Sequence, residues 1–351
     1  MKQPALAHQE ARHFTVPILS TRGLSIGYTS KRGTLELESN LDIQVYNGEL
    51  VCLIGPNGCG KSTLMRTIAG LQKPLSGDTF IADVDVKSIK PHQYARLLSL
   101  VLTDKINVGA MTVMDIVSIG RYPYTNYFAR LEARDHEMIE QSLESVHLSS
   151  YKNRFFHELS DGEKQRVLIA KALAQDTPLI MLDEPTAHLD LPNRVEIMNI
   201  LKQLAKNTNK AILLSTHELD LALQTADTIW LMAREEELKS GTPEDLVLSG
   251  MFEQVFKSNS FQFDKHTGSF KVVHPTKGKV ALLGEGVHHT WTKRALEREG
   301  YEVIRDPDFP IRIQHDKKTW QLYINGQTKG CQDIFELLQM IRSEIQVAEK
   351  K

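Results

Sequence analysis

A glycine-rich stretch that includes a lysine and a serine carries the clearest chemical signal in the sequence. Residues 55–62 read Gly-Pro-Asn-Gly-Cys-Gly-Lys-Ser and fit the pattern G-x-x-x-x-G-K-[ST]. Glycines let a backbone curl until successive N–H groups point at phosphate oxygens. The lysine adds a cation near the β- and γ-phosphates, and the serine hydroxyl binds Mg²⁺. The pattern predicts a loop for Mg-ATP, formed by Gly55, Pro56, Asn57, Gly58, Cys59, Gly60, Lys61, Ser62 and Thr63.

Regular structure is expected on both sides of this loop. Residues 49–54 form a compact apolar run that predicts a strand. After the loop, Leu64, Ile68 and Leu71 are spaced i, i+4 and i+7, which predicts a helix with one apolar face. A phosphate-binding loop requires this order of strand, loop and helix, and the helix N-terminus adds positive charge.

A pair of carboxylates follows a second apolar strand, predicted over residues 179–182. Asp183 is placed to hold Mg²⁺, as in phosphate-loop enzymes generally. Its neighbour Glu184 can orient and deprotonate an attacking water. Because side chains alternate along a strand, the two carboxylates need not share one task.

A histidine follows a third apolar strand, predicted over residues 211–215. Apolar runs without alternation suit strands that are buried on both faces, as in a parallel sheet covered by helices. Ligands bind at the carboxyl ends of such strands. We therefore expect His217 to reach the γ-phosphate from the same edge of the sheet as the acidic pair.

Composition and charge limit the class of protein. The chain has 351 residues, of which 41% are hydrophobic and 25% charged, and its formal net charge is −2, which argues against a protein that coats nucleic acid. No apolar run reaches the roughly 18 to 20 residues that a membrane-spanning helix needs. The first 14 residues lack the apolar core of a secretory signal, and the three cysteines show no metal-ligand spacing. These features predict a soluble cytosolic protein and are compatible with docking onto a membrane partner.

One further segment makes the class specific. Residues 159–166 read Leu-Ser-Asp-Gly-Glu-Lys-Gln-Arg and resemble the signature LSGGQ-x-QR of the ATP-binding subunits of ABC transporters. The phosphate loop, this signature, the acidic pair, residues 187–190 (Ala-His-Leu-Asp) and His217 occur in the order found in that family. The resemblance extends over residues 19–253.

The resemblance implies roles for more residues. Tyr28 resembles the aromatic residue that stacks on adenine, and Asp190 resembles the aspartate of the D-loop, which lies across the dimer interface. Two ATP molecules would lie between two copies of the chain, each completed by the signature of the other copy. The signature residues that would act on that ATP are Ser160, Asp161, Gly162 and Glu163.

The sequence departs from the family pattern in two places. Asp161 stands where glycine is usual and Glu163 where glutamine is usual, while Ser160 and Gly162 are kept. The Q-loop glutamine should follow the strand over residues 98–102, but Thr103 occupies that position. Threonine has a shorter reach for the usual water-mediated link between Mg²⁺ and the transport partner.

The segment over residues 111–124 resembles one subgroup, the importers of iron–siderophores, haem and vitamin B12. It contains Gly120-Arg-Tyr-Pro123, similar to the Gly-Arg-x-Pro stretch that lies near the membrane partner in that subgroup. The resemblance implies integral-membrane permease subunits and a second copy of the chain as partners, and a periplasmic or surface substrate-binding protein as an indirect one. It implies no nucleic acid, and a peripheral location at the cytoplasmic face of the inner membrane.

The predicted fold is α/β: a P-loop NTPase (ABC ATPase) domain with an antiparallel β subdomain and a helical insert, followed by a small α+β domain. We expect an N-terminal tail (1–18), the ATP-binding domain (19–256, with the insert at about 104–160), a linker (257–278) and a small domain (279–351) of unknown role. The small domain carries no motif that we can name, and a regulatory or dimer-stabilising role is our hypothesis. Its expected strands and helices are 279–283, 291–299 (helix), 301–305, 311–315, 320–324 and 332–345 (helix).

Two other functions fit parts of this pattern. A soluble ABC ATPase of repair or translation would usually carry two ATPase halves or a long coiled-coil insertion, and neither is seen in the sequence. A regulatory module that binds ATP with little turnover is made plausible by Thr103, but the set of Asp183, Glu184 and His217 argues against it.

Overall fold

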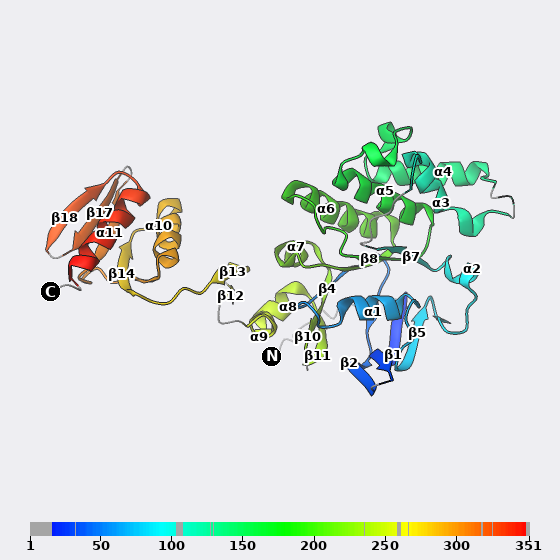
Figure 1. Ribbon diagram of the computed structural model, residues 1–351, viewed down its shortest axis with the longest axis horizontal. Helices are drawn as coiled ribbons and strands as arrows, with labels where there is room; N and C mark the ends of the chain where they lie inside the picture. Colours follow the sequence, from blue (N-terminus) through cyan, green and yellow to red (C-terminus); the bar gives the residue numbers. More distant parts are fainter. Residues whose placement is uncertain are drawn as a thin grey trace, which may run out of the picture. The chain divides into compact units, whose positions relative to one another are not determined.

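The computed structural model divides into a larger unit, residues 1–256 with 265–268, and a smaller unit, residues 257–264 with 269–351 (Figure 1). Each unit is described by itself. The described residues are 16–31, 33–102, 108–126, 128, 130–234, 236–257, 261–265, 267–316, 319–324 and 326–348.

A mainly parallel sheet with the strand order β11-β10-β4-β9-β8-β7 forms the centre of the larger unit. All neighbouring pairs are parallel except β10 and β11. The strands are β4 (Leu50–Ile54), β7 (Leu98–Val101), β8 (Leu179–Asp183), β9 (Ala211–Ser215), β10 (Thr228–Ala233) and β11 (Glu236–Gly241).

The predicted apolar strands are confirmed as the buried centre of this sheet. Every residue of β4 and β9 is buried, because neighbouring strands and packed helices cover them. The parallel pairing of β4 with β9 and of β8 with β9 brings the carboxyl ends of the three strands to one edge. Neighbouring positions of that edge are therefore occupied by the start of the phosphate loop, by Asp183 and by Ser215.

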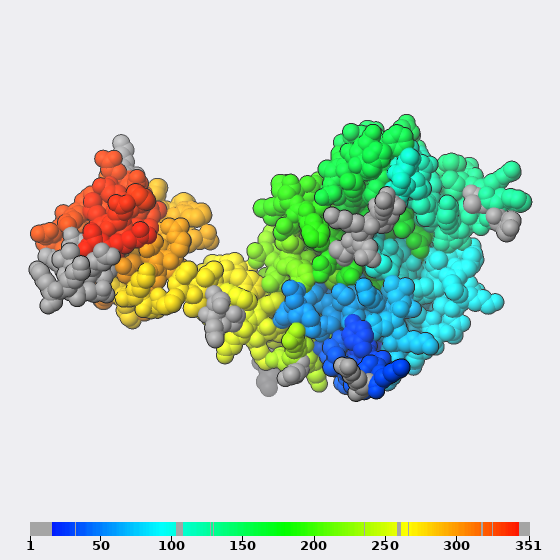
Figure 2. Space-filling view, viewed as in Figure 1, coloured from blue at the N-terminus to red at the C-terminus, as the bar shows by residue number. Residues whose placement is uncertain are grey.

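An antiparallel sheet with the order β2-β1-β5-β6, in which β3 also pairs with β1, lies beside the parallel sheet. Its side chains share one hydrophobic core with β4 and with the helix after the phosphate loop, including Leu24, Val51 and Leu64. In the space-filling view this N-terminal part appears in blue along one side of the larger unit (Figure 2). The strands are β1 (Leu19–Ser30), β2 (Gly33–Leu41), β3 (Gln44–Val45), β5 (Ser76–Ile81) and β6 (Val84–Asp85).

The helix after the phosphate loop is shorter than predicted. Leu64 and Ile68 are fully buried, but Leu71 is 60% exposed and lies beyond the end of the helix at Ile68. Gly70 stops the helix because its φ of 65° belongs to the left-handed region that glycine adopts readily. The expected stripe therefore has two members on the helix, and the third was wrongly assigned.

The helical insert contains α3 and α4, which pack against each other and against α5 (Figure 1). The helices of the larger unit are α1 (Lys61–Ile68), α2 (Pro91–Tyr94), α3 (Val113–Ile119), α4 (Ala133–Ser145), α5 (Asp161–Ala174), α6 (Leu191–Thr208), α7 (Leu219–Thr225), α8 (Pro243–Leu248) and α9 (Met251–Val255). Short 3₁₀ turns are η1 (Tyr122–Tyr124), η2 (Ser149–Tyr151) and η3 (Phe156–Glu158).

The stretch that we expected to be a linker contains regular structure. Strands β12 (Phe261–Asp264) and β13 (Ser269–Val272) pair antiparallel within residues 257–278. The ring of Phe270 packs edge-on against Phe261 and Phe263. Cross-strand aromatic pairs stabilise such a hairpin, and the polar turn residues concealed it in the sequence.

The smaller unit is a sheet with the order β15-β14-β16-β17-β18, and α10 and α11 share one core with it. The core side chains on β14, β16 and β17, such as Leu282, Ile313 and Leu322, belong to one face of the sheet. The α+β character is as predicted, although the edge strand β18 was missed and α10 begins earlier than expected. The elements are β14 (Gly278–Leu283), α10 (Val287–Arg298), β15 (Tyr301–Ile304), β16 (Arg312–Asp316), β17 (Thr319–Ile324), β18 (Gln327–Cys331) and α11 (Ile334–Ala348).

Candidate functional site

The phosphate loop joins β4 to α1 in a shape that requires glycine. A Cβ added to Gly55 would lie 2.1 Å from the carbonyl oxygen of Met232, and Gly60, directly before α1, has a φ of 112°. The ammonium of Lys61 donates hydrogen bonds to the carbonyl oxygens of Gly55 (2.8 Å) and Pro56 (3.1 Å). The loop thus closes around the lysine, as expected for a loop whose backbone N–H groups receive an anion.

Lys61 is only 6% exposed. Burial lowers its pKa, whereas Cys59, Glu184 and Asp183 act in the opposite direction. A desolvated ammonium near two carboxylates gains strongly from a bound polyanion, because the site excludes much of the water that would screen it. Burial also raises the pKa of the Cys59 thiol, which keeps this loop residue in its unreactive protonated form.

The acidic pair is held by a residue that the sequence analysis did not single out, Ser215. Its hydroxyl donates a 2.6 Å hydrogen bond to Oδ1 of Asp183. The backbone N–H of Glu184 lies 3.0 Å from Oγ and 3.2 Å from the carbonyl oxygen of the same serine. Glu184 itself has a φ of 49°, an uncommon value for a residue with a Cβ. Strained backbone of this kind is concentrated at active sites.

His217 and Glu184 meet at the same edge. Nε2 of His217 lies 2.7 Å from Oε1 of Glu184, a hydrogen bond between side chains that come from neighbouring strands. A carboxylate paired with an imidazole in this way can accept a proton from water while the ring fixes its orientation. We call Lys61, Asp183, Glu184, Ser215 and His217 the strand-end site.

Tyr28 lies beside the start of α1. Its hydroxyl and that of Thr63 are 2.6 Å apart, so one donates to the other. The side chain is on β1, and the residue is 49% exposed. A tyrosine anchored at its hydroxyl and open elsewhere can present its ring to a planar base.

The signature turn, residues 160–163, begins α5. Ser160 is the N-cap of this helix, and Glu163 N–H lies 3.3 Å from its hydroxyl oxygen. In return, Oε2 of Glu163 accepts hydrogen bonds from the N–H (2.8 Å) and the hydroxyl (2.9 Å) of Ser160. This capping box explains why the helix starts at Asp161.

A contact between helices joins the signature turn to Asp190. A Cβ on Gly162 would lie 2.3 Å from Oδ1 of Asn193, so Gly162 allows α5 and α6 to approach closely. Asn193 in turn donates from Nδ2 to Oδ1 of Asp190 at 2.5 Å. Asp190 is the N-cap of α6. The sequence pattern named Gly162 and Asp190 but missed Asn193, which connects them.

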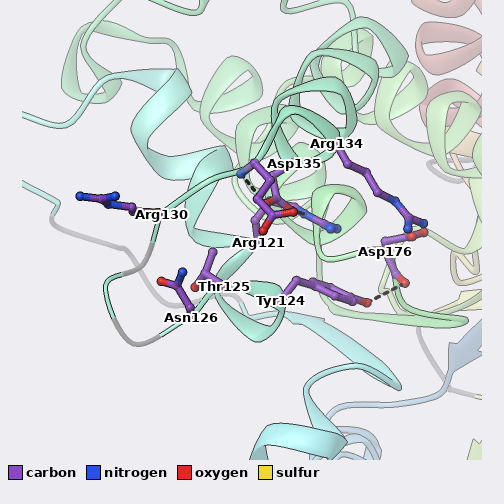
Figure 3. A pocket seen from close by; sticks show the side chains of 9 residues that line it. Arg121, Tyr124, Thr125, Asn126, Arg130, Arg134, Asp135 and Asp176 are labelled. Atoms are coloured by element: carbon purple, nitrogen blue, oxygen red, sulfur yellow. Dashed lines mark hydrogen bonds and ion pairs between the residues drawn. The ribbon is translucent and has the colours of Figure 1, made fainter.

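The Gly-Arg-x-Pro segment lies in the helical insert. Arg121 is buried and donates from Nε to Asp135 (2.8 Å) and from Nη1 to the carbonyl of Ala174 (2.7 Å). Its guanidinium lies 4.1 Å from the ring centre of Tyr124, whose hydroxyl donates to the carbonyl of Asp176. A polar cavity of about 210 Å³ is lined in part by Arg121, Tyr124, Asp135 and Asp176 (Figure 3). The arginine that the sequence singled out is therefore part of a buried ion pair in the helical insert.

The structure brings together the predicted phosphate loop, acidic pair and histidine, and it places the signature turn at the start of a separate helix. Thr103 lies outside the described residues. Ser215 could have been suspected as a polar residue that ends an apolar strand. Asn193 had no signal, because only the packing of α5 on α6 gives it a partner.

Comparison with known proteins connects these features to a family. The sequence profile described as "ABC transporter" matches residues 39–187. A second profile, described as "Iron ABC transporter C-terminal domain", matches residues 277–342. The smaller unit, which carried no motif that we could name, therefore corresponds to a recognised domain.

Relatives cover most of the chain. An uncharacterised ABC transporter ATP-binding protein of Methanocaldococcus jannaschii is 34% identical over 289 residues, which are 82% of this chain and 98% of the relative. The petrobactin import ATP-binding protein FpuD of Bacillus anthracis is 34% identical, with 68% and 86% covered. The iron(3+)-hydroxamate import ATP-binding protein FhuC of Bacillus subtilis is 33% identical, with 68% and 87% covered.

Solved structures have the same fold. The cbiO1 subunit of the ABC transporter complex cbiONQ from Clostridium perfringens is 26% identical, with a TM-score of 0.59, and 68% of this chain and 93% of that chain are covered. An ABC transporter assigned to the metal-chelate type, solved in an inward-facing conformation, gives 28% identity, a TM-score of 0.59 and coverage of 69% and 89%.

Family, relatives and fold agree with the strand-end site and favour the transporter interpretation over a non-transport ATPase or a regulatory module. No helix within the described ranges is long and apolar enough to span a bilayer. The chain therefore belongs to the family of ATP-hydrolysing, ATP-binding subunits of ABC transporters.

Proposed function

We propose that this chain powers an importer of iron–siderophore complexes or of a related metal chelate. The observation that carries the ATPase part is the strand-end site, in which the Glu184–His217 pair lies beside the phosphate loop. The import part is supported by the named relatives, by the profile that matches the smaller unit and by the Gly-Arg-x-Pro segment.

Within the proposal, the phosphate loop wraps the β- and γ-phosphates of ATP, and Lys61 exchanges its two carbonyl partners for phosphate oxygens. Ser62 and Asp183 offer the hard oxygen atoms that Mg²⁺ prefers, and Ser215 already orients the Asp183 carboxylate. A bound Mg²⁺ would neutralise part of the negative charge of the phosphates. The loop residues Gly55 to Thr63 are assigned to ATP in this way.

Glu184 is the general base of the proposed reaction. It orients a water and accepts its proton, while His217, held at 2.7 Å, fixes the carboxylate and faces the γ-phosphate. Positioned bases typically contribute about 10²–10⁴-fold to a rate. Tyr28 would stack on the adenine while its hydroxyl stays on Thr63.

The second copy of the chain completes each site in this proposal. Ser160 and the Gly162 N–H would bind the γ-phosphate held by the other copy, with Asp161 and Glu163 beside them, and Asp190 would lie across the interface. A helix start that presents N–H groups and a hydroxyl is suited to an anion. ATP-driven closure and release after hydrolysis would then move the permease partners.

The proposed location is the cytoplasmic face of the inner membrane, where the chain would bind integral-membrane permease subunits. A periplasmic or surface substrate-binding protein would act only indirectly, and no nucleic acid partner is proposed. The smaller unit is proposed to regulate or stabilise the dimer. Thr103, at the Q-loop position, is proposed to weaken the link between Mg²⁺ and the permease.

The decisive experiment compares the purified chain with Glu184→Gln. We expect Mg²⁺-dependent turnover that rises more than linearly with protein concentration, and at least about 100-fold less turnover in the variant. ATP binding should remain, and the variant should form a dimer with ATP on a sizing column. A monomeric variant with undiminished turnover would contradict the role of Glu184.

Transport is tested separately in the source cell. Replacement of the chain by the Glu184→Gln form should stop uptake of iron–siderophore complexes. If uptake of these complexes is unchanged while vitamin B12 or haem uptake stops, the cargo is a related metal chelate and not an iron–siderophore complex, and the importer role stands.

A further inference from the structure

The signature turn differs from the family pattern at Glu163, and this residue makes specific contacts. Its Oε2 accepts hydrogen bonds from both the N–H and the hydroxyl of Ser160. We propose that Glu163 is a positioning residue that holds Ser160 in a resting arrangement and must release it before the signature turn can bind ATP on a second copy. This inference rests on the proposed sandwich dimer.

The chemistry of the hydroxyl gives the first argument. A serine hydroxyl has a single hydrogen to donate, and here it is directed to the Glu163 carboxylate at 2.9 Å. A phosphate oxygen is also an acceptor, so Ser160 cannot donate to Glu163 and to phosphate at the same time. Binding of the γ-phosphate therefore requires the hydrogen bond within the signature turn to break.

Charge gives the second argument. Partial burial raises the pKa of Glu163, but hydrogen bonds from Ser160 and Tyr151 and the charge of Arg154 outweigh it and hold the pKa below its ordinary value. Glu163 is therefore an anion at neutral pH, next to the hydroxyl that should receive another anion. The Glu163 carboxylate and the γ-phosphate would compete for this one donor and repel each other, and the repulsion disfavours the closed dimer.

The neighbouring Asp161 does not have the same role. Its side chain is 76% exposed, and its carboxylate is compensated by Lys164 at 3.7 Å on the next turn of α5. The hydroxyl of Ser160 exchanges hydrogen bonds with Glu163, and the N–H of Ser160 donates to the same carboxylate. Glu163 is therefore the residue that links the charge of the turn to the state of the serine.

The structure also offers a matched control, Glu158. Its carboxylate accepts from the N–H of Phe155 (3.3 Å) at the start of η3, in the same relation in which Glu163 accepts from Ser160. Glu158→Gln removes the same charge from the same region and from the same kind of cap. It leaves Ser160 and Glu163 unchanged.

The experiment measures ATP-dependent dimerisation of the full chain by light scattering, in the Glu184→Gln background that prevents turnover. Adding Glu163→Gln should lower the ATP concentration for half-maximal dimerisation by about three- to tenfold, the effect expected of one partly screened charge. Adding Glu158→Gln should change it by less than about twofold. The gain from Glu163→Gln should be clearly smaller when Ser160→Ala is also present, because the part of the gain that comes from releasing that serine is then absent.

Melting temperatures separate this role from a purely structural one. Glutamine can still accept from the Ser160 N–H, so the variant should fold, with a slightly lower melting temperature from the weaker cap. A destabilised variant that dimerises at lower ATP supports the proposal. An unchanged or higher ATP requirement, an equal gain from Glu158→Gln, or a gain that is as large without Ser160 as with it overturns it. If the Glu184→Gln parent itself never dimerises, the sandwich function fails together with this inference.

Discussion

The strand-end site and the signature turn are proposed to share one chemical task, the binding of phosphate, but they are built in different ways. The strand-end site lies on the ends of buried parallel strands, and Ser215 and His217 hold its carboxylates within hydrogen-bond distance. The signature turn lies at an exposed helix start and satisfies its own donors through Ser160 and Glu163. In the free chain, the carboxylates of the strand-end site are held in place by neighbouring side chains, whereas the donors of the signature turn are occupied by acceptors of the turn itself.

The two sites differ because different parts of the structure hold their side chains in place. Neighbouring strands fix the strand-end site, because a shift of one residue in their register would misplace buried side chains. A capping box is local, and its hydrogen bonds exchange at little cost when a stronger partner arrives. The proposed sandwich dimer would benefit from this division, since only the half contributed by the other copy would have to change.

The largest effect should come from the phosphate loop. Lys61→Ala removes the buried ammonium that contacts Gly55 and Pro56, and turnover should fall by at least about 100-fold, with ATP binding also weakened. The control is Lys210→Ala, which removes a lysine that pairs with Asp176 at 2.8 Å. Retained turnover in Lys61→Ala would show that the loop is not the phosphate site.

Ser215→Ala tests whether the strand-end site is arranged in advance. The variant loses the hydrogen bond to Asp183 and one to the N–H of Glu184, so turnover should fall by about 10- to 100-fold while ATP binding persists. Ser99→Ala is the control, because Ser99 is a fully buried serine on β7 that bonds Ala172. An equal loss of turnover in the control would reduce the role of Ser215 to general stability.

The close packing of Gly162 against Asn193 provides a test of the signature turn, the second site in the comparison. Gly162→Ala places a Cβ 2.3 Å from Oδ1 of Asn193, and such overpacking costs on the order of 1–3 kcal/mol. We expect about a tenfold loss of turnover, and part of it should return in the double variant with Asn193→Ala. Gly241→Ala, whose Cβ would meet Leu246 at an ordinary 3.4 Å, should behave like the parent. No effect of Gly162→Ala would mean that the turn moves freely away from α6.

The smallest effect concerns the pH dependence of folding stability at a buried carboxyl group, Glu38. Glu38 on β2 is 7% exposed, and burial, helped by Glu237 and opposed by the N–H of Leu238, raises its pKa from 4.5 to about 7. The folded chain keeps this proton at pH values where the unfolded chain has lost it. The contribution to stability is full below pH 4.5 and is lost as the pH rises through 7.

Glu38→Gln should therefore raise the free energy of unfolding at pH 8 by about 1–3 kcal/mol and change it little at pH 4.5. Urea unfolding at both pH values measures this difference. Glu36→Gln, an exposed position on the same strand, should show no such pH dependence. An equal response in both variants would assign the effect to surface charge.

Much of the strand-end site was predictable, because each part leaves a local trace. The loop from Gly55 to Ser62 follows a fixed spacing that the phosphate geometry demands, and the acidic pair and His217 each follow an apolar strand. Turn-rich composition misled the prediction at residues 257–278, where paired aromatic rings form a hairpin. The helix was wrongly predicted to include Leu71, because hydrophobic periodicity takes no account of Gly70, whose left-handed backbone ends the helix.

By itself, the sequence predicted which residues would bind phosphate, hold Mg²⁺ and activate water, since those tasks demand particular side chains at particular spacings. Only the tertiary structure decided which groups hold them. Ser215 reaches Asp183 because β8 and β9 are neighbours, and Asn193 reaches Gly162 because α6 packs on α5. The hydrogen bond between Ser160 and Glu163 is different, because it is local and its Ser-x-x-Glu spacing is typical of a capping box, although the sequence analysis did not single it out. Contacts between distant segments depend on strand order and helix packing, which local spacing does not encode.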